Sequence, residues 1–403
     1  IIIPSKILPY RSISVISAII AIAGVYILLY YSHFPRIIKY LLPFTYFVFY
    51  QYAVIARSYA LVPILLFAIA SIYNQKSDKI YLFTLLVCLL AYVSVFSTLI
   101  ALSIMFIHLI DTIKARKILT KPLLIKQIIA FGIFVMAIAL LVIILYPPQD
   151  YTFAKGYRYN IKNFYNLSRD ILNDALTNKL YLSIPLLIIS LFWFWQKRLF
   201  LLYVLSNLSV LILFSVKYYN SWHLGFIFLT WVFVLWLSFD KQDQRIENHR
   251  FANIIKNIVI ASVLIVLGFN IYWAGTASIN DFNGTYSAGK AISSYIKENQ
   301  LEDKKIYATS FWSVTILPYF DKNIFSNYNS EERTTYWLWS TKNSRMEDFN
   351  KIIADQPDLI ILGRGNEQDI PNYRFIGIFS GNLYWKSGIK ESNHFAVFRK
   401  INE

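Results

Sequence analysis

Ten apolar runs lie in the first two thirds of this chain, and they restrict its fold more than any other feature. A helix needs about 20 apolar residues to cross a hydrocarbon core about 30 Å thick. Several runs are only about 15 residues long, so these are expected to be tilted, broken or re-entrant. With 57% hydrophobic residues and a mean hydropathy of +0.46, the chain is predicted to be a polytopic α-helical membrane protein with about ten spans. The runs cover residues 13–31, 41–55, 58–73, 80–94, 97–111, 127–146, 181–195, 199–216, 223–239 and 253–274.

Charge is distributed unevenly along the chain. Residues 1–274 carry 24 Lys and Arg against 8 Asp and Glu, whereas residues 275–403 carry 15 of each, so the net charge of +16 belongs to the apolar part. The loops that follow the odd-numbered runs hold 15 Lys and Arg in 50 residues, and the other connecting segments hold 9 in 56. Basic loops stay in the cytoplasm. The loop 147–180 and everything after Trp273 are therefore predicted on the outer face. Basic loops can attract anionic lipids or phosphates, and nucleic acid is not an expected partner.

After Trp273 the pattern changes to that of a small α/β domain. Helical periodicity alternates with short strand patterns and ends in closing strands. We therefore divide the chain into a multi-span membrane domain, residues 1–274, and an extracytoplasmic α/β domain, residues 275–403. The stretch from Gly363 to Gly365 lacks the spacing of a phosphate-binding glycine loop, so no nucleotide site is expected. The predicted elements are helices at 287–298 and 346–355 and strands at 305–309, 358–363, 375–379, 383–386 and 395–399.

Arg57 stands between the second and third apolar runs, where a spanning helix would normally carry Leu or Ile. An arginine at the centre of a membrane helix costs about 2.5–3.5 kcal/mol on insertion scales, so it usually lies near the water boundary or faces a polar cavity. One interpretation is an arginine whose stem lies in the apolar layer while its head reaches the interface. The other is an anion-binding arginine with Gln51, Tyr52 and Tyr59 as polar neighbours. The sequence leaves both open.

A second polar cluster, Lys217 to His223, lies between two apolar runs on the predicted outer face. Its aromatic residues are typical of an interfacial belt. Lys217 and His223 could instead neutralise a phosphate in the same cavity that Arg57 would face. Both interpretations remain open at this stage.

The loop 147–180 holds the acidic residues of the outer face. Apolar periodicity from Phe164 to Leu172 predicts an amphipathic helix at the membrane interface, although the segment could also form a wall of a substrate cavity. A group transfer to a hydroxyl or amine would need a base, and a carboxylate can serve as one. In residues 1–274 the outer face offers only Asp150, Asp170 and Asp174 for that role.

Signatures of metal sites and of nucleophilic catalysis are missing. Five histidines are scattered along the chain and there is one cysteine, Cys88. No HExxH stretch occurs, so neither a zinc site nor a Cys/His pair is expected.

The stretch Tyr52 to Leu61, YAVIARSYAL, resembles the Gln/Glu-x-Arg-x-Tyr-x-Leu element of C-superfamily membrane glycosyltransferases. The nearest branch is the bacterial one close to protein O-mannosyltransferases and aminoarabinose transferases. The resemblance implies that Arg57 lies near a carrier phosphate, that Tyr59 supports it, and that Lys217 and His223 are basic residues before a late helix. It also implies catalytic carboxylates in a first outer loop, which is expected upstream of Ile1, so this chain is expected to be truncated. The histidine that relatives often carry at the turn 94–97 is missing here.

These features together predict a glycosyltransferase of the bacterial inner membrane. Its donor would be a polyprenyl-phosphate-linked sugar and its acceptor a lipid, glycan or protein at the outer face, with Tyr52 among the substrate-binding residues. The catalytic base would be upstream of Ile1 or, failing that, one of the three outer-face aspartates. A divalent cation, Mg²⁺ or Mn²⁺, could stabilise the departing phosphate. The alternatives are a flippase-like transporter of lipid-linked glycans and a non-catalytic scaffold.

Overall fold

The chain divides into two compact units. The computed structural model describes residues 11–55, 58–152, 161–240, 249–327, 339–341 and 348–401. Unit 1 comprises Ile1–Tyr146 and Gly156–Ala274, and unit 2 comprises Pro147–Lys155 and Gly275–Glu403. The first residues of the loop 147–180 therefore belong with the C-terminal part of the chain.

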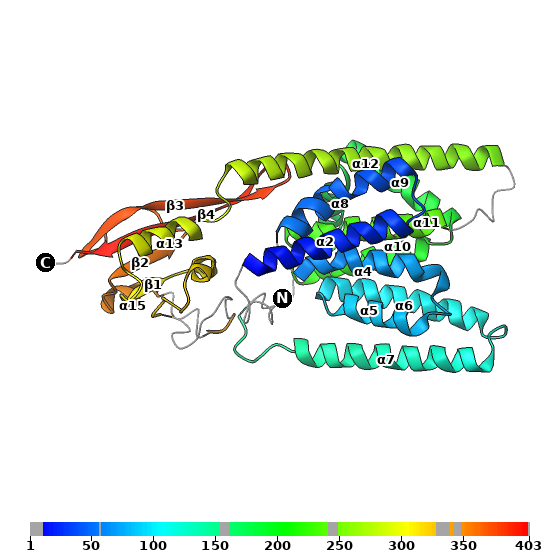
Figure 1. Ribbon diagram of the computed structural model, residues 1–403, viewed down its shortest axis with the longest axis horizontal. Coiled ribbons are helices and arrows are strands. Elements are labelled where there is room, and N and C mark those ends of the chain that lie inside the picture. Colours follow the sequence, from blue (N-terminus) through cyan, green and yellow to red (C-terminus); the bar gives the residue numbers. More distant parts are fainter. Residues whose placement is uncertain are drawn as a thin grey trace. The chain divides into compact units, whose positions relative to one another are not determined.

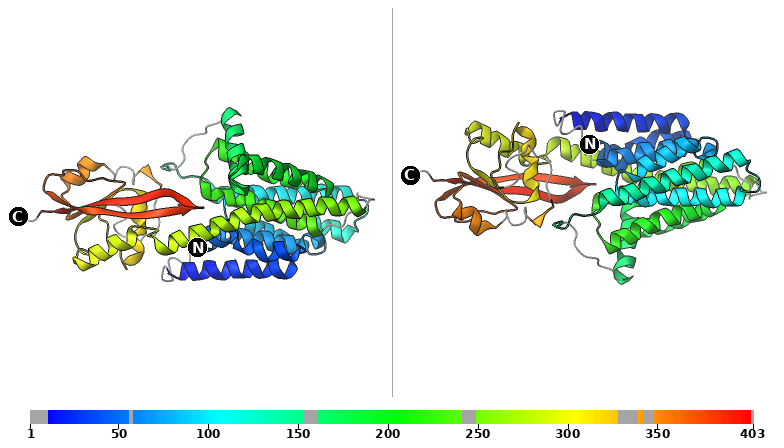
Figure 2. Two further views of the ribbon diagram at one scale, coloured as in Figure 1. Left: turned by 90° about the horizontal axis from the view of Figure 1, so that it is seen from above. Right: turned by 90° about the horizontal axis from the view of Figure 1, so that it is seen from below.

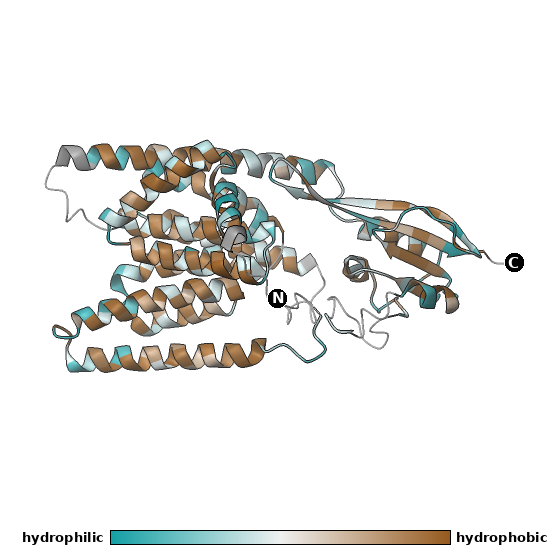
Figure 3. Ribbon diagram, turned by 180° about the vertical axis from the view of Figure 1, so that it is seen from behind, coloured by the Kyte–Doolittle hydropathy of each residue, from teal (hydrophilic) through white to brown (hydrophobic). Residues whose placement is uncertain are grey.

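Unit 1 is built from helices, most of which run side by side in the views of Figures 1 and 2. Hydrophobic residues make up much of these helices (Figure 3). The last helix continues past Ala274 into unit 2. In chain order the elements are α2 (Arg11–Tyr31), α3 (Arg36–Leu41), η1 (Leu42–Phe44), η2 (Tyr46–Val54), η3 (Ser58–Ala60), α4 (Leu61–Ile72), η4 (Tyr73–Gln75), α5 (Ile80–Ala91), α6 (Val95–Ala115), α7 (Lys121–Leu145), α8 (Ile161–Leu176), α9 (Leu180–Gln196), α10 (Phe200–Val216), η5 (Ser221–His223), α11 (Leu224–Asp240) and α12 (His249–Asn283).

Six helices among the described residues are long and apolar enough to cross a membrane, and a seventh crossing results if the bent pair α8 and α9 counts as one. The helices α5 and α10 are also apolar, but they have only 12 and 17 residues. A full crossing usually takes about 20 residues. This part of the chain is thus mostly helical and compatible with a multi-pass membrane protein of about six candidate spans.

The second apolar run, residues 41–55, does not form a single α-helix. A 3-10 turn containing Pro43 is followed by η2, a π-helix of nine residues. Six residues of η2 are buried, and inside it the Tyr46 hydroxyl donates to the Gln51 side-chain oxygen at 3.1 Å. Proline removes a backbone hydrogen-bond donor and interrupts an α-helix, which explains the break near the start of this apolar run. Insertions of π-helix often mark functional sites.

Helix α11 forms the centre of unit 1. Every residue of this helix from Leu224 to Ser238 is buried. It packs on α4, α8, α10 and η2. Two indole N–H groups in this core donate to serine hydroxyls: Trp193 to Ser238 at 2.7 Å, and Trp231 to Ser190 at 3.0 Å. Buried polar groups need such partners, so these bonds fix the contact between α9 and α11.

The amphipathic helix predicted in the loop 147–180 is confirmed as α8. Its Ile171, Ala175 and Leu176 are buried, and it packs on α9, α10 and α11. The chain bends by 87° between α8 and α9. The predicted position of this helix at the membrane interface stays a prediction.

Two polar contacts join loops that the charge distribution assigns to the same side. His33 Nδ1 lies 2.7 Å from a carboxylate oxygen of Asp240, and Lys76 Nζ lies 2.7 Å from one of Asp111. All four residues lie in or beside loops predicted to be cytoplasmic. Each contact therefore brings together two loop ends that the loop assignment predicts on the same side.

Unit 2 is a four-stranded sheet of order β1-β2-β4-β3 with helices on its faces. The strands β1 and β2 are parallel, whereas β4 is antiparallel to both β2 and β3. The prediction of two separate strands at 375–379 and 383–386 is wrong, because the single strand β3 runs through both ranges. The elements are α13 (Gly289–Glu298), β1 (Ile306–Ala308), η6 (Phe311–Thr315), η7 (Leu317–Tyr319), α15 (Phe349–Ala354), β2 (Leu359–Gly363), β3 (Tyr373–Trp385) and β4 (Gly388–Lys400).

The strands of unit 2 bury alternate residues on opposite faces. Leu359 and Ile361 of β2 join the cluster that includes Ile292 of α13. Their neighbours Ile360 and Leu362 join the second cluster, which contains Ile352 of α15. A period of two along the strand sends successive side chains to opposite faces. The sheet is therefore covered on both faces, as an α/β layer structure requires.

Candidate functional site

Three of the residues proposed for substrate binding meet at one end of unit 1. The rings of Tyr52 and Tyr59 lie 5.7 Å apart, and those of Tyr59 and His223 lie 6.0 Å apart. The Tyr59 hydroxyl oxygen lies 3.4 Å from His223 Nε2. Arg57 lies outside the described residues, but it is two positions from Tyr59 in the sequence.

His223 is fully buried among aromatic rings, with an exposed fraction of 0%. Its closest ring contact is Phe96, at 4.3 Å between centroids, followed by Tyr218 at 5.0 Å. The backbone N–H of Asn220 donates to His223 Nδ1 at 3.1 Å. A neutral imidazole that accepts at Nδ1 carries its proton on Nε2, which faces Tyr59. The Nε2–H group is therefore placed to donate to the hydroxyl oxygen of Tyr59, a half-buried residue.

Tyr52 is 1% exposed, and its hydroxyl donates to the Trp222 carbonyl oxygen at 3.0 Å. A Cβ at Gly225 would lie 2.4 Å from that hydroxyl oxygen. This glycine leaves the space that the tyrosine side chain occupies. Tyr52 thus ties the end of η2 to the start of α11, which supports a positioning role for it.

Lys217 is the C-cap of α10 and is exposed. Two residues further on, burial raises the pKa of Tyr219, and the carboxylates of Asp174 and then Asp170 raise it further. Both acids therefore lie near the loop that carries His223. Asp170 is 60% exposed and pairs with Arg169 at 2.9 Å.

Asp150, the third carboxylate considered as a base, belongs to unit 2. Its side chain is exposed, and its backbone carbonyl accepts from the Thr341 N–H at 2.9 Å. The three outer-loop acids are thus divided between the two units: Asp170 and Asp174 lie on α8 of unit 1, and Asp150 belongs to unit 2.

The turn 94–97, where the enzymes that the sequence resembles often have a histidine, also reaches this group through Phe96. Ser94 and Ser97 form a capping box that starts α6 and fixes the position of Phe96. A serine followed three residues later by another small polar residue is a signal that the sequence offers. What the sequence does not offer is the packing of Phe96 on His223, because the two are far apart along the chain.

Among the residues that the structure describes, no group of three or more His, Cys, Asp or Glu side chains is placed to hold a metal ion. The suggested divalent cation therefore has no ligand set in this part of the chain, and no step is assigned to it.

Comparison of the chain with protein-family models, with curated proteins and with solved structures found no match in any of the three. The function has to be argued from the residues and geometry described above.

Proposed function

We propose that this chain is a membrane glycosyltransferase that moves a sugar from a polyprenyl-phosphate carrier to a lipid, glycan or protein acceptor. The observation that carries the proposal is the meeting of three separate stretches at one end of unit 1. Tyr59, two positions after Arg57, contacts His223 of the Lys217 to His223 cluster. Helix α8, which carries Asp170 and Asp174, packs on α10 and α11, the helices on either side of that cluster, and the charges of both acids act on Tyr219 within it. Candidate phosphate ligands and candidate bases are thereby brought to the same end.

The proposed transfer breaks one bond to the sugar and forms another. The bond between the sugar C1 and the carrier phosphate oxygen breaks, and the phosphate leaves with the electron pair. An acceptor hydroxyl or amine forms a new bond to C1 and gives its proton to a carboxylate, for which Asp174 and Asp170 are the candidates. Arg57 and Lys217 stabilise the charge on the departing phosphate. The Tyr59 hydroxyl, held by His223, orients the phosphate.

The proposal includes the location of the protein. We place it in the bacterial inner membrane with ten crossings, of which α5, α10 and the segment α3 to η2 are short. The basic loops face the cytoplasm, and unit 2 lies on the outer side. The positive-inside bias of the loops supports this orientation.

Carrier binding can be tested by photocrosslinking. The protein, in phospholipid nanodiscs, is exposed to a photoreactive polyprenyl-phosphate sugar. Arg57→Ala is expected to lower the yield about tenfold or more, because a charge-assisted hydrogen bond contributes about 1.5–3 kcal/mol. The matched control is Arg116→Ala, an exposed arginine that caps α6 at a predicted cytoplasmic loop. Equal labelling of Arg57→Ala and wild type would contradict the phosphate role.

A further inference from the structure

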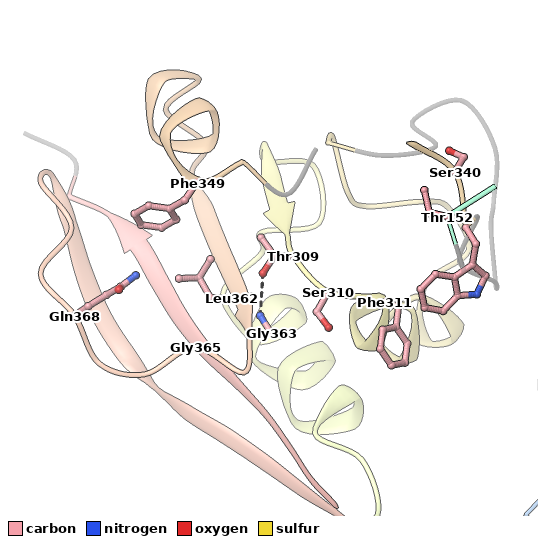
Figure 4. A pocket seen from close by; sticks show the side chains of 11 residues that line it. Thr152, Thr309, Ser310, Phe311, Ser340, Phe349, Leu362, Gly363, Gly365 and Gln368 are labelled. Atoms are coloured by element: carbon pink, nitrogen blue, oxygen red, sulfur yellow. Dashed lines mark hydrogen bonds between the residues drawn. The ribbon is translucent and has the colours of Figure 1, made fainter. Parts of the chain in front are cut away.

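Unit 2 contains a cavity of about 530 Å³ that the proposed transfer chemistry does not use. It lies within this unit, at the carboxyl ends of the parallel strands β1 and β2, where Thr309 and Ser310 follow one strand and Gly363 ends the other (Figure 4). Ligands of α/β sheets commonly bind at such strand ends. Its volume falls in the range of about 300–1,000 Å³ that is typical of ligand pockets.

The floor of the cavity is formed by backbone in unusual conformations. Ser310 has φ +73°, a region that side chains rarely adopt. The Gly363 N–H donates to the Thr309 hydroxyl oxygen at 3.0 Å, and a Cβ at Gly363 would lie 2.4 Å from the Cβ of Ser310. The two strand ends therefore approach more closely than any residue but glycine permits. Strained backbone of this kind gathers at binding sites.

The walls of the cavity are aromatic. Phe311 and Trp339 contact each other at 5.5 Å between ring centroids, and they are 39% and 37% exposed. Phe349 lines the opposite wall (Figure 4). The backbone holds Trp339 in place, because its carbonyl accepts from the Thr152 N–H at 3.0 Å. Large rings left open to water beside a cavity are suited to stack on a flat ligand.

The polar groups at the rim are hydroxyls and an amide. They come from Thr152, Ser340 and Gln368, together with Thr309 and Ser310 on the floor. None of the described residues that line the cavity is charged. Hydroxyl and amide groups can hydrogen-bond to the hydroxyls of a neutral ligand, so the described lining fits a ligand rich in hydroxyl groups.

We propose that this cavity binds an uncharged sugar unit of a glycan. A pyranose ring presents C–H groups on its faces, which pack on the electron-rich faces of Phe311 and Trp339. Its hydroxyls lie at the ring edge, within the reach of hydroxyl and amide partners such as Ser340 and Gln368. The inference concerns binding alone, goes beyond the proposed transfer, and holds whether or not the chain moves a sugar.

The test is binding of neutral oligosaccharides to the whole protein. Phospholipid nanodiscs are required, because the sugar headgroups of common detergents would compete for the cavity. A panel of neutral glucose, mannose, galactose and N-acetylglucosamine oligomers is titrated and followed by saturation-transfer NMR and calorimetry. At least one member is expected to bind, and Trp339→Ala is expected to weaken that binding tenfold or more.

Two further variants keep the result interpretable. Gln368→Leu removes an exposed amide without touching the core and is expected to weaken the same ligand severalfold. Phe282→Ala removes another aromatic side chain of unit 2, 89% exposed and outside the cavity lining, and is expected to leave binding unchanged. The proposal is overturned if no panel member binds, or if binding survives both Trp339→Ala and Gln368→Leu in protein that retains its wild-type melting temperature.

Discussion

Tyr59 links the buried histidine of unit 1 to the surface of the candidate site. His223 itself is enclosed by rings, and its Nδ1 is occupied by the Asn220 N–H. Its Nε2 lies 3.4 Å from the Tyr59 hydroxyl oxygen. On the proposed function, a phosphate bound by Arg57 would interact with His223 through this tyrosine.

Tyr59→Phe removes the hydroxyl and keeps the ring contacts with Tyr52 and Phe226. Transfer activity is expected to fall severalfold, less than in Arg57→Ala. The reason is that the arginine carries the charge that stabilises the phosphate, whereas the tyrosine only orients the phosphate. Steady-state rates of both variants in proteoliposomes check this order. Equal losses in the two variants would show that the stretch acts as a structural motif.

Gly225→Ala is expected to destabilise unit 1 by about 1–3 kcal/mol, because the added methyl would overlap the Tyr52 hydroxyl and ring. The matched control is Gly268→Ala, where nothing lies within 4 Å of the added Cβ in α12. Alanine in a helix interior stabilises by up to about 1 kcal/mol relative to glycine. Thermal unfolding of the two variants should therefore shift in opposite directions, and similar shifts would contradict the tight contact.

Tyr307 gives unit 2 a pH-dependent stability. Its hydroxyl donates to a carboxylate oxygen of Asp355 at 2.7 Å, and burial, this bond and the carboxylate charge raise the pKa of Tyr307 to about 12. An unfolded tyrosine ionises near pH 10. The stabilisation is thus complete below about pH 10 and is lost as the pH rises toward 12.

Tyr307→Phe is expected to cost about 1.5–3 kcal/mol at pH 8, and its difference from wild type should shrink by pH 11. Chemical denaturation at the two pH values measures both quantities. A difference that stays constant between pH 8 and pH 11 would show that the bond does not hold the proton on Tyr307.

At the scale of elements, the spacing of apolar residues predicted the helices and strands that bury one face in the core. The helix α8 was predicted from its apolar spacing, and α13, β1 and β2 lie within the ranges expected for them. The π-helix η2 was not predictable, because its residues carry the same apolar signal as an α-helix. Phe47 of η2 packs on Phe228 of α11, at 5.3 Å between ring centroids, and such a contact between distant parts of the chain is not visible in the sequence.

The strand β3 shows the same limit. The predicted strands 375–379 and 383–386 left Gly381 and Asn382 between them, yet both residues lie in the paired register with β4. A Cβ at Gly381 would lie 2.6 Å from the Cα of Ser287. The glycine is needed for a close approach of two backbones and not for a turn, and only the folded packing reveals that distinction.

The sequence predicted single residues of the candidate site but not which of them lie together. Tyr59 and His223 were identified from their polar surroundings in an apolar sequence, and the structure brings them together. The separation of Asp150 from Asp170 and Asp174 could not be foreseen, since all three lie in one loop. Asp150 belongs with unit 2 because the backbone of residues 150 and 152 hydrogen-bonds to residues 339–341.

Helix α8 is the element that should supply the base. Asp174→Asn or Asp170→Asn is expected to lower the transfer rate by about 10²-fold or more, the usual contribution of a general base. Asp150→Asn, in unit 2, is the control and should leave the rate within a factor of two or so of wild type. Full activity in both α8 variants would exclude these two residues as the base.

At the scale of the whole molecule, the two units divide the proposed tasks. Unit 1 would hold the lipid carrier among its helices, and unit 2 would bind a neutral sugar unit at its strand ends. The charge distribution assigns the loop after α6 and the end of α12 to opposite sides of the membrane.

Cysteine labelling tests that orientation. Cys88 is replaced by Ala, and single cysteines are placed at Ile118, which is 88% exposed, and at Phe282, which is 89% exposed. A membrane-impermeant maleimide added to intact cells, or to spheroplasts where an outer barrier exists, should label Phe282→Cys. Ile118→Cys should react only after the membrane is permeabilised. The reverse pattern would invert the proposed topology.

The decisive measurement follows both halves of a doubly labelled donor, with one label on the polyprenyl phosphate and the other on the sugar. Purified full-length protein in proteoliposomes is incubated with this donor and a membrane extract that supplies acceptors. We expect the labels to separate, with free polyprenyl phosphate released and the sugar on an acceptor, and Arg57→Ala to prevent this. Labels that stay together, even if the donor crosses the bilayer, would contradict a transferase and point to a carrier of intact lipid-linked glycans.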